Sequence, residues 1–138
     1  ALVPEARWSE TITDQSDTIL CVDSASLVQP ADAGCVIVTG SHGGLIGGNP
    51  KRALKAKGRL AVFSDAGGGK NSIGTSRLPA LQDQGIAAVT VSHDSCRIGD
   101  AASVLNTGVI STANQLATSL GARPQSRLWN FLAALTQR

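Results

Sequence analysis

Three stretches of this chain decide its fold. Residues 35–43 read Cys-Val-Ile-Val-Thr-Gly-Ser-His-Gly, residues 60–70 read Leu-Ala-Val-Phe-Ser-Asp-Ala-Gly-Gly-Gly-Lys, and residues 86–97 read Ile-Ala-Ala-Val-Thr-Val-Ser-His-Asp-Ser-Cys-Arg. Each begins with an apolar run of strand length and continues into a loop rich in glycine, histidine or serine. Continuous apolar strands are typical of a parallel sheet that is covered on both faces. The pattern therefore predicts strands at 35–39, 60–63 and 86–91.

Helix signals lie between and after these strands. Asn49 suits an N-cap, Pro50 the first helical position and Gly58 the residue after a helix, which predicts a helix over 51–57. Leucines and a following glycine predict another helix over 77–84. Six residues share one face at helical spacing and predict a helix over 109–120: Val109, Ile110, Ala113, Leu116, Ala117 and Leu120. A last helix is expected over 127–136.

The remaining segments complete one α/β domain spanning residues 1–138. Residues 17–22 are expected to form a further strand, 24–33 a connection, and 1–16 an irregular N-terminal arm, with the last helix lying within 124–138. The expected architecture has three layers, a mostly parallel sheet with helices on both faces, and is Rossmann-like or flavodoxin-like. Because crossovers between parallel strands are right-handed, the loops should meet at the C-terminal edge of the strands, where such sheets bind ligands.

Composition narrows the range of partners. The chain has a net charge of +2, two Trp, two Phe and no Tyr, which argues against nucleic-acid binding. No apolar run approaches the roughly 20 residues that cross a bilayer. Three cysteines without Cys-x-x-Cys spacing suggest neither a disulfide framework nor a zinc site. We therefore expect a cytoplasmic protein without nucleic-acid or membrane partners.

The loop after the second strand has the composition of an anion cradle. Gly67, Gly68 and Gly69 allow main-chain N–H groups to turn around an anion, and Lys70 adds a positive charge. The loop is not a Walker A motif, because Asn71 stands where that motif has Ser or Thr. We expect this loop to bind an anionic group. The alternative is a flexible glycine turn.

The first loop presents a histidine between small residues. Because Ser41 and Gly43 flank it closely, His42 could reach a ligand and titrate near neutral pH. Its spacing carries no metal signature. The alternative is a histidine that caps a neighbouring helix.

The third loop, residues 92–100, carries more chemistry than a connector needs. Arg97 could grip a substrate carboxylate, and Cys96 would have a lowered pKa if it opened the next helix. Alternatively, Asp94 and Ser95 only cap that helix and Cys96 is buried behind them.

Together the loops suggest roles for their residues. His42 or His93 would move the proton, Asp65 or Asp94 would orient the imidazole, and Cys96 is a variant nucleophile. The substrate-binding residues would be Ser41, Gly43, Gly67, Gly68, Gly69, Lys70, Asn71, Ser95 and Arg97. No metal is assigned, and the sequence identifies no cofactor.

Two short stretches resemble known families. The Ser41-His42-Gly43 loop, followed about 50 residues later by Ser95-Cys96-Arg97-Ile98-Gly99, resembles the His and Cys loops of caspase-type peptidases. It lacks the family's Gln-Ala before the cysteine and inserts Ile98 before the glycine. Asp94-Ser95-Cys96-Arg97 is similar to the Cys-bearing loop of isochorismatase-like amide hydrolases. Either resemblance implies a cysteine hydrolase with Cys96 as the nucleophile.

The leading hypothesis is an enzyme or catalytic subunit that acts on a small carboxylate- or amide-bearing metabolite by hydrolysis or elimination. The rival hypotheses are a non-catalytic or regulatory subunit that binds an anionic metabolite, and an interaction domain. Trp129 and Phe131 give the last helix more apolar surface than one stripe requires, which favours a homo-oligomer or a subunit of a larger enzyme.

Overall fold

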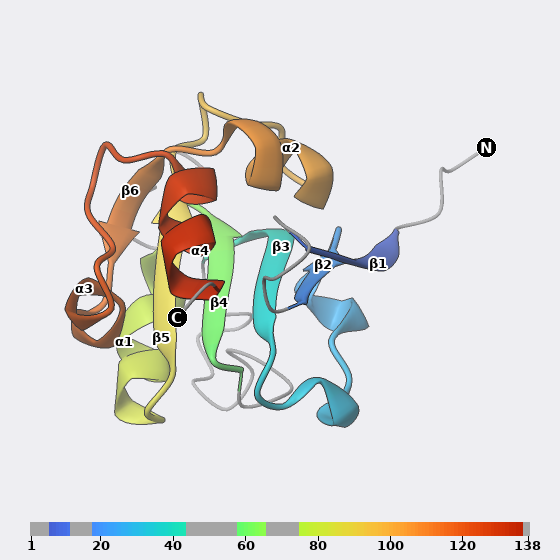
Figure 1. The fold of residues 1–138 in the computed structure, drawn as a ribbon, viewed down its shortest axis with the longest axis horizontal. Coiled ribbons are helices and arrows are strands. Elements are labelled where there is room, and N and C mark those ends of the chain that lie inside the picture. The colour runs from blue at the N-terminus through green and yellow to red at the C-terminus, as the bar shows by residue number, and fades with distance from the viewer. Residues whose placement is uncertain (1–5, 12–17, 44–57, 66–74, 137–138) are drawn as a thin grey trace.

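A computed structural model of the chain describes residues 6–11, 18–43, 58–65 and 75–136, which form a six-stranded sheet with helices packed against it (Figure 1). The strands lie across the sheet in chain order: β1 (Arg7–Glu10), β2 (Ile19–Val22), β3 (Val36–His42), β4 (Leu60–Ser64), β5 (Ala87–Val91) and β6 (Ile110–Ala113). Strands β2 to β5 are parallel, whereas β1 and β6 pair antiparallel at the two edges. The expected α/β class with a mostly parallel sheet is confirmed.

The strand order differs from the Rossmann-like and flavodoxin-like orders that we expected. In those sheets the order in which strands are added reverses once, so that the connections on either side of this point lie on opposite faces. The gap between these connections is a crevice that binds the ligand. Here each parallel strand is added on the same side of the one before it. Right-handed crossovers then leave their connections on one face of the sheet. The short helix η1 (Ala25–Leu27), after β2, and α1 (Arg77–Asp83), after β4, contribute to the same hydrophobic cluster, as this rule requires.

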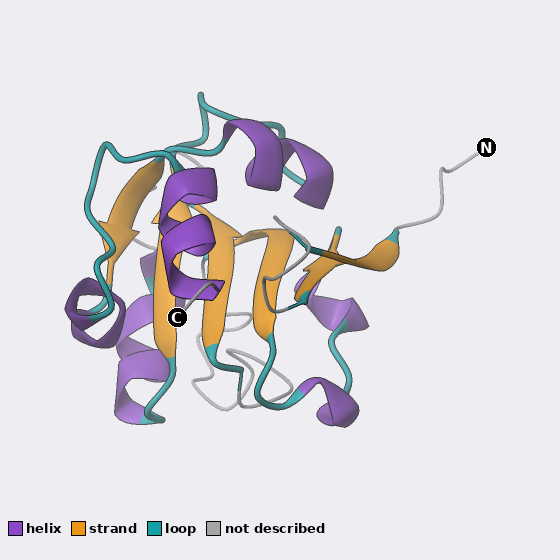
Figure 2. Cartoon of the chain, in the orientation of Figure 1, coloured by secondary structure: helices purple, strands orange, loops and turns teal. Residues whose placement is uncertain are grey.

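Two separate hydrophobic clusters lie on the two faces of the sheet, because successive residues of each strand point to opposite sides. The first contains Leu81 of α1 together with Phe63 of β4. The second contains residues of α2 (Ala101–Thr107) and α4 (Leu128–Thr136), with Ala117 of α3 (Gln115–Ser119). Figure 2 shows the helices around the central strands. The chain therefore changes face between α1 and α2, through the loop that follows β5.

Helices α1 and α4 confirm the predictions over 77–84 and 127–136, but the helix predicted over 109–120 is wrong. The chain forms strand β6 there, and helix α3 begins only after Asn114. Ile110 and Thr112 are β-branched, which favours a strand, and β6 pairs with β5. The Asn114 side chain accepts a hydrogen bond from the Ala117 N–H at 3.0 Å and so caps α3.

The first half of the chain adds two details. Where an irregular arm was expected over 1–16, residues 7–10 form β1, and the Arg7 guanidinium makes two hydrogen bonds of 2.7 and 2.8 Å to the Asp32 carboxylate. The connection over 24–33 contains η1 and a second short helix, η2 (Pro30–Asp32). The helix predicted over 51–57 lies outside the described residues.

Helix α4 uses its apolar surface within its own domain. Leu128, Leu132 and Leu135 are fully buried, Phe131 is buried, and Trp129 packs against the same cluster. The apolar width that suggested an oligomer is thus explained by intramolecular packing. Within the described residues, no helix combines the length and apolarity that crossing a bilayer requires.

Candidate functional site

Main-chain hydrogen bonds hold the starts of the three loops together at the C-terminal edge of the sheet. The Gly43 N–H donates to the Ser64 carbonyl at 2.7 Å, and the Asp65 N–H donates to the Val91 carbonyl at 2.9 Å. His42 lies opposite Ser64 in the pairing of β3 with β4. Strand β3 thus extends through Ser41 and His42, which were expected in a loop.

The loop after β5 runs back over the ends of β3 and β2 before it enters α2. The Gly99 N–H donates to the Gly40 carbonyl at 2.7 Å, and the Ala101 N–H donates to the Asp23 carboxylate at 3.1 Å. Helix α2 contacts both strands. This loop is long because the chain crosses here from one face of the sheet to the other.

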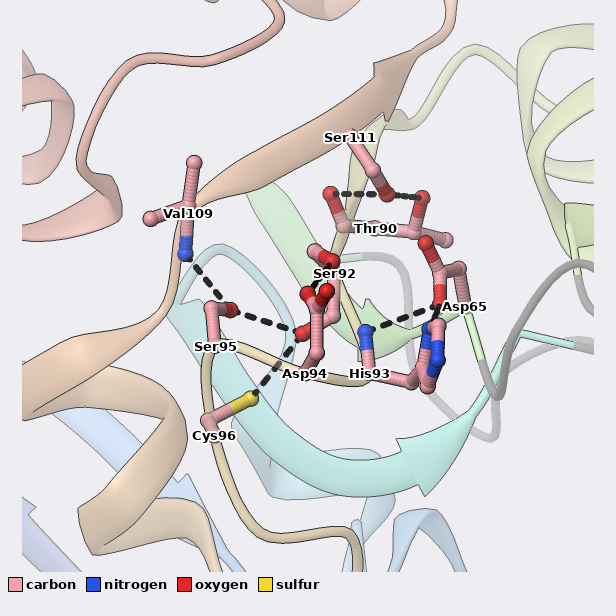
Figure 3. A network of polar contacts seen from close by, with 9 residues as sticks. All are labelled: Asp65, Thr90, Ser92, His93, Asp94, Ser95, Cys96, Val109 and Ser111. Atoms are coloured by element: carbon pink, nitrogen blue, oxygen red, sulfur yellow. Dashed lines mark hydrogen bonds and ion pairs between the residues drawn. The ribbon is translucent and has the colours of Figure 1, made fainter.

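Asp65 and His93 form a pair at this edge (Figure 3). One carboxylate oxygen of Asp65, Oδ1, accepts the His93 main-chain N–H at 3.0 Å and lies 3.5 Å from the His93 Nδ1. The carboxylate side chain is 13% exposed and the imidazole is 57% exposed. A mostly buried carboxylate therefore faces one nitrogen of an accessible imidazole.

Asp94 lies beside this pair, and its pKa is lowered from the ordinary value. The Ser92 hydroxyl donates a hydrogen bond to its carboxylate. That bond lowers the pKa of Asp94, with a smaller contribution from His93. Asp94 is exposed, so it adds negative charge to the rim of the site.

Ser95 and Cys96 point into the structure. The Ser95 hydroxyl donates to the Ser92 carbonyl at 2.7 Å and accepts the Val109 N–H at 3.0 Å. The Cys96 thiol lies 3.7 Å from the same carbonyl and is partly buried, which raises its pKa. A lowered pKa was expected only if Cys96 opened the next helix, and that condition is not met.

Helix α2 shows why the condition is not met. It begins at Ala101 rather than at Cys96, and its N-cap is Asp100, whose carboxylate accepts the Ser103 N–H at 3.1 Å. Cys96 thus receives no stabilisation from a helix start. Capping by Asp94 and Ser95, the alternative interpretation of this loop, is wrong.

The other predicted residues differ in accessibility. Arg97 is 82% exposed, with its guanidinium 3.9 Å from Asp100, and His42 is exposed at the end of β3. The Ser41 hydroxyl accepts the Ala25 N–H at 2.7 Å, and Gly43 is buried. His42 and Arg97 thus lie exposed at the rim of the site. Ser41 and Gly43 instead make hydrogen bonds that hold the main chain in place.

The predicted anion cradle falls on Gly67, Gly68, Gly69, Lys70 and Asn71, which lie outside the described residues. In the part of the chain that the structure describes, no three Asp, Glu, His or Cys side chains gather closely enough to hold a metal ion. No disulfide joins the three cysteines, all of which are described.

One residue at this edge escaped the sequence analysis. Arg77 is only 2% exposed, and its guanidinium lies 4.8 Å from the centre of the Phe63 ring. The main-chain N–H of Arg77 donates to the Gly43 carbonyl at 2.7 Å. Burial lowers the pKa of Arg77. The sequence carried a signal for this unusual position. Arg77 begins the helix predicted over 77–84, and a cation at the start of a helix is unfavourable because it opposes the helix dipole.

Searches against profiles of known protein families, curated protein sequences and solved structures each found no match.

Proposed function

We propose that the chain is a small-molecule enzyme, or the catalytic subunit of one, in which His93 is a general acid and base oriented by Asp65. The observation that carries this proposal is the Asp65–His93 pair at the C-terminal edge of the sheet. A carboxylate that faces one imidazole nitrogen selects the tautomer and fixes the ring plane. The other nitrogen, Nε2, then faces away from Asp65. A separation of 3.5 Å is long for a hydrogen bond, but such contacts often tighten when substrate binds.

We infer the substrate class from residues of the second and third loops. Arg97 at the rim can bind a carboxylate through two parallel hydrogen bonds, and Gly67, Gly68, Gly69 and Lys70 provide the proposed anion cradle. We therefore propose a small metabolite that carries a carboxylate or an amide, and hydrolysis or elimination as the reaction. In this proposal the ligand lies at the C-terminal edge of a three-layer domain that acts in the cytoplasm.

The structure supports His93 rather than Cys96 as the reactive group. The raised pKa of Cys96 disfavours the thiolate, which is the nucleophilic form. Its thiol also lies toward the Ser92 carbonyl. A cysteine hydrolase with Cys96 as the nucleophile is therefore the less favoured proposal.

The test is turnover by the purified chain of a panel of small amides, hydroxy acids and dicarboxylates, with products followed by NMR. His93→Gln should lower kcat by about 10²- to 10⁴-fold, the range of general acid–base catalysis. Asp65→Asn should lower it by up to about 10⁴-fold, the loss seen when the carboxylate that orients a catalytic imidazole is replaced by an amide.

Asp83→Asn is the matched control for Asp65→Asn. Asp83 is an exposed carboxylate at the end of α1, shortly before β5 begins and therefore near the opposite edge of the sheet. This variant should keep parental kcat. Turnover that survives His93→Gln would overturn the proposal. Tight retention of a metabolite without turnover would favour the binding-module alternative.

A further inference from the structure

The Ser95 hydroxyl joins the loop that carries His93 to the start of β6. Its oxygen donates to the Ser92 carbonyl at 2.7 Å and accepts the Val109 N–H at 3.0 Å. The Ser92 N–H in turn donates to the Val109 carbonyl at 2.8 Å. Figure 3 shows the two bonds of the Ser95 hydroxyl. With the Ser92–Val109 main-chain bond, Ser92, Ser95 and Val109 form a closed set of hydrogen bonds next to His93 in the chain.

A second hydroxyl holds the same turn from helix α2. Thr107 Oγ1 donates to the Ser95 carbonyl at 2.7 Å. The turn from Ser92 to Ser95 is thus attached to Val109, the residue directly before β6, through the Ser95 side chain and to α2 through the Ser95 main chain. His93 lies within this turn, and its N–H bond to Asp65 is a third attachment.

We infer that Ser95 is a positioning residue for His93: its hydroxyl holds the 92–95 turn so that the imidazole stays beside the Asp65 carboxylate. The catalytic consequence rests on the proposed function, whereas the geometric part does not. Removal of the hydroxyl leaves the Val109 N–H without its acceptor and the Ser92 carbonyl with one donor fewer. The turn then relaxes, and the imidazole spends less time at Asp65.

The experiment reads the tautomer of His93 in the full chain labelled with ¹⁵N-histidine. His42→Gln assigns the signals, because the chain contains two histidines. At about pH 8, where an ordinary imidazole is neutral, the parent should show His93 enriched in the Nδ1–H form. Asp65→Ala is the reference for complete loss of that enrichment, because it removes the carboxylate. Ser95→Ala should move the His93 ring shifts from the parental value toward the Asp65→Ala value.

Two further variants sharpen the result. Thr107→Val removes the second attachment at an exposed position, and it should cause a smaller shift in the same direction. Ser119→Ala is the matched control, because the Ser119 hydroxyl also donates to a main-chain carbonyl, that of Gln115 at 3.0 Å, but in α3. Ser119→Ala should keep the parental His93 spectrum.

Parental ring shifts in folded Ser95→Ala, or in Thr107→Val if Ser95→Ala does not fold, would overturn the inference. A different result would contradict the proposed function alone. In that case His93 shows the expected tautomer, but the chain turns over no substrate of the panel. If both hold, Ser95→Ala should lower kcat by about 10- to 100-fold with KM little changed, because a small misplacement of a catalytic group acts on the reacting geometry.

Discussion

At Gly40 the fold leaves no room for a side chain. A Cβ atom there would lie 2.5 Å from the Asp100 nitrogen, 2.6 Å from the Asp23 carbonyl oxygen and 2.7 Å from the Gly99 carbonyl carbon. All three are main-chain atoms, so none can move aside as the end of a flexible side chain would. We expect Gly40→Ala to lower the free energy of unfolding by about 1–3 kcal/mol or more, the range for overpacking. Urea denaturation measures this loss.

Gly34 is the control that separates steric conflict from backbone conformation. Apart from Gly34 itself and its two chain neighbours, nothing lies within 4 Å of where a Cβ atom would be, but the φ of Gly34 is +83°. Gly34→Ala should therefore destabilise through conformation alone, by about 1–2 kcal/mol. Asparagine tolerates this conformation, so Gly34→Asn should recover part of the loss, whereas Gly40→Asn should be worse than Gly40→Ala. Equal behaviour at the two positions would contradict the steric argument.

At the scale of elements, Asn114 connects β5, α1 and α3. Its amide oxygen accepts the N–H groups of Ala88 and Ala117, at 3.1 and 3.0 Å, and its amide nitrogen donates to the carbonyls of Leu78 and Ile86. All four contacts are buried. Asn114→Ala removes an N-cap and leaves buried main-chain groups unpaired, so it should lower the free energy of unfolding by about 2–4 kcal/mol.

Asn106→Ala is the corresponding control, because Asn106 is exposed on α2. Its effect should stay within about 0.5 kcal/mol, as for most surface substitutions. Chemical denaturation of both variants compares them directly. A loss at Asn114 no larger than that at Asn106 would show that the four hydrogen bonds do not stabilise the fold.

Asn114 also shows why one element was mispredicted. The spacing of apolar residues over 109–120 fits a helix, but it arises from a strand followed by a short helix that meet at this residue. The bond from the Ala117 N–H to Asn114 is local, so the helix start could have been recognised. The pairing of β6 with β5 is not local, and apolar spacing does not encode it.

The candidate site, like the fold, could be predicted from the sequence only in part. Asp65 and His93 each follow a buried strand, so their meeting at one edge follows from the rule for parallel strands. The inward orientation of Ser95 depends on Val109, which belongs to a later part of the chain. Its assignment to substrate binding could not be refined from residue type alone.

At the scale of the whole molecule, the strand order accounts for the place of the site. A sheet without a reversal has no crevice between diverging connections. Instead, the part of the chain that the structure describes changes face between α1 and α2, and the loop that makes this change lies across the C-terminal edge. That loop carries His93, Asp94, Ser95, Cys96 and Arg97 of the candidate site.

The oligomeric state stays a prediction. The apolar residues of α4 are buried in their own domain, and among the described residues Ile98 is the large hydrophobic side chain that is exposed. A homo-oligomer would therefore have to use a surface other than the apolar face of α4. Light scattering measures the mass, and a monomer mass would remove the prediction.

The stability of the whole molecule should depend on pH through Asp32, which fixes the edge strand β1 by binding Arg7. The hydrogen bonds from the Arg7 guanidinium, and a further one from the Gln29 N–H, lower the pKa of Asp32 in the folded state. A lowered folded pKa means that the stabilisation is complete above the unfolded value, about 3.9, and is lost as pH falls through the folded pKa. Asp32→Asn should therefore be less stable than the parent at pH 7, and the difference should shrink between about pH 4 and pH 2.

Urea denaturation across this range measures the difference in stability, with the exposed Asp83→Asn as a control that should show little difference at any pH. A difference between parent and Asp32→Asn that stays constant from about pH 7 to about pH 2 would mean that the carboxylate charge does not hold β1 in place.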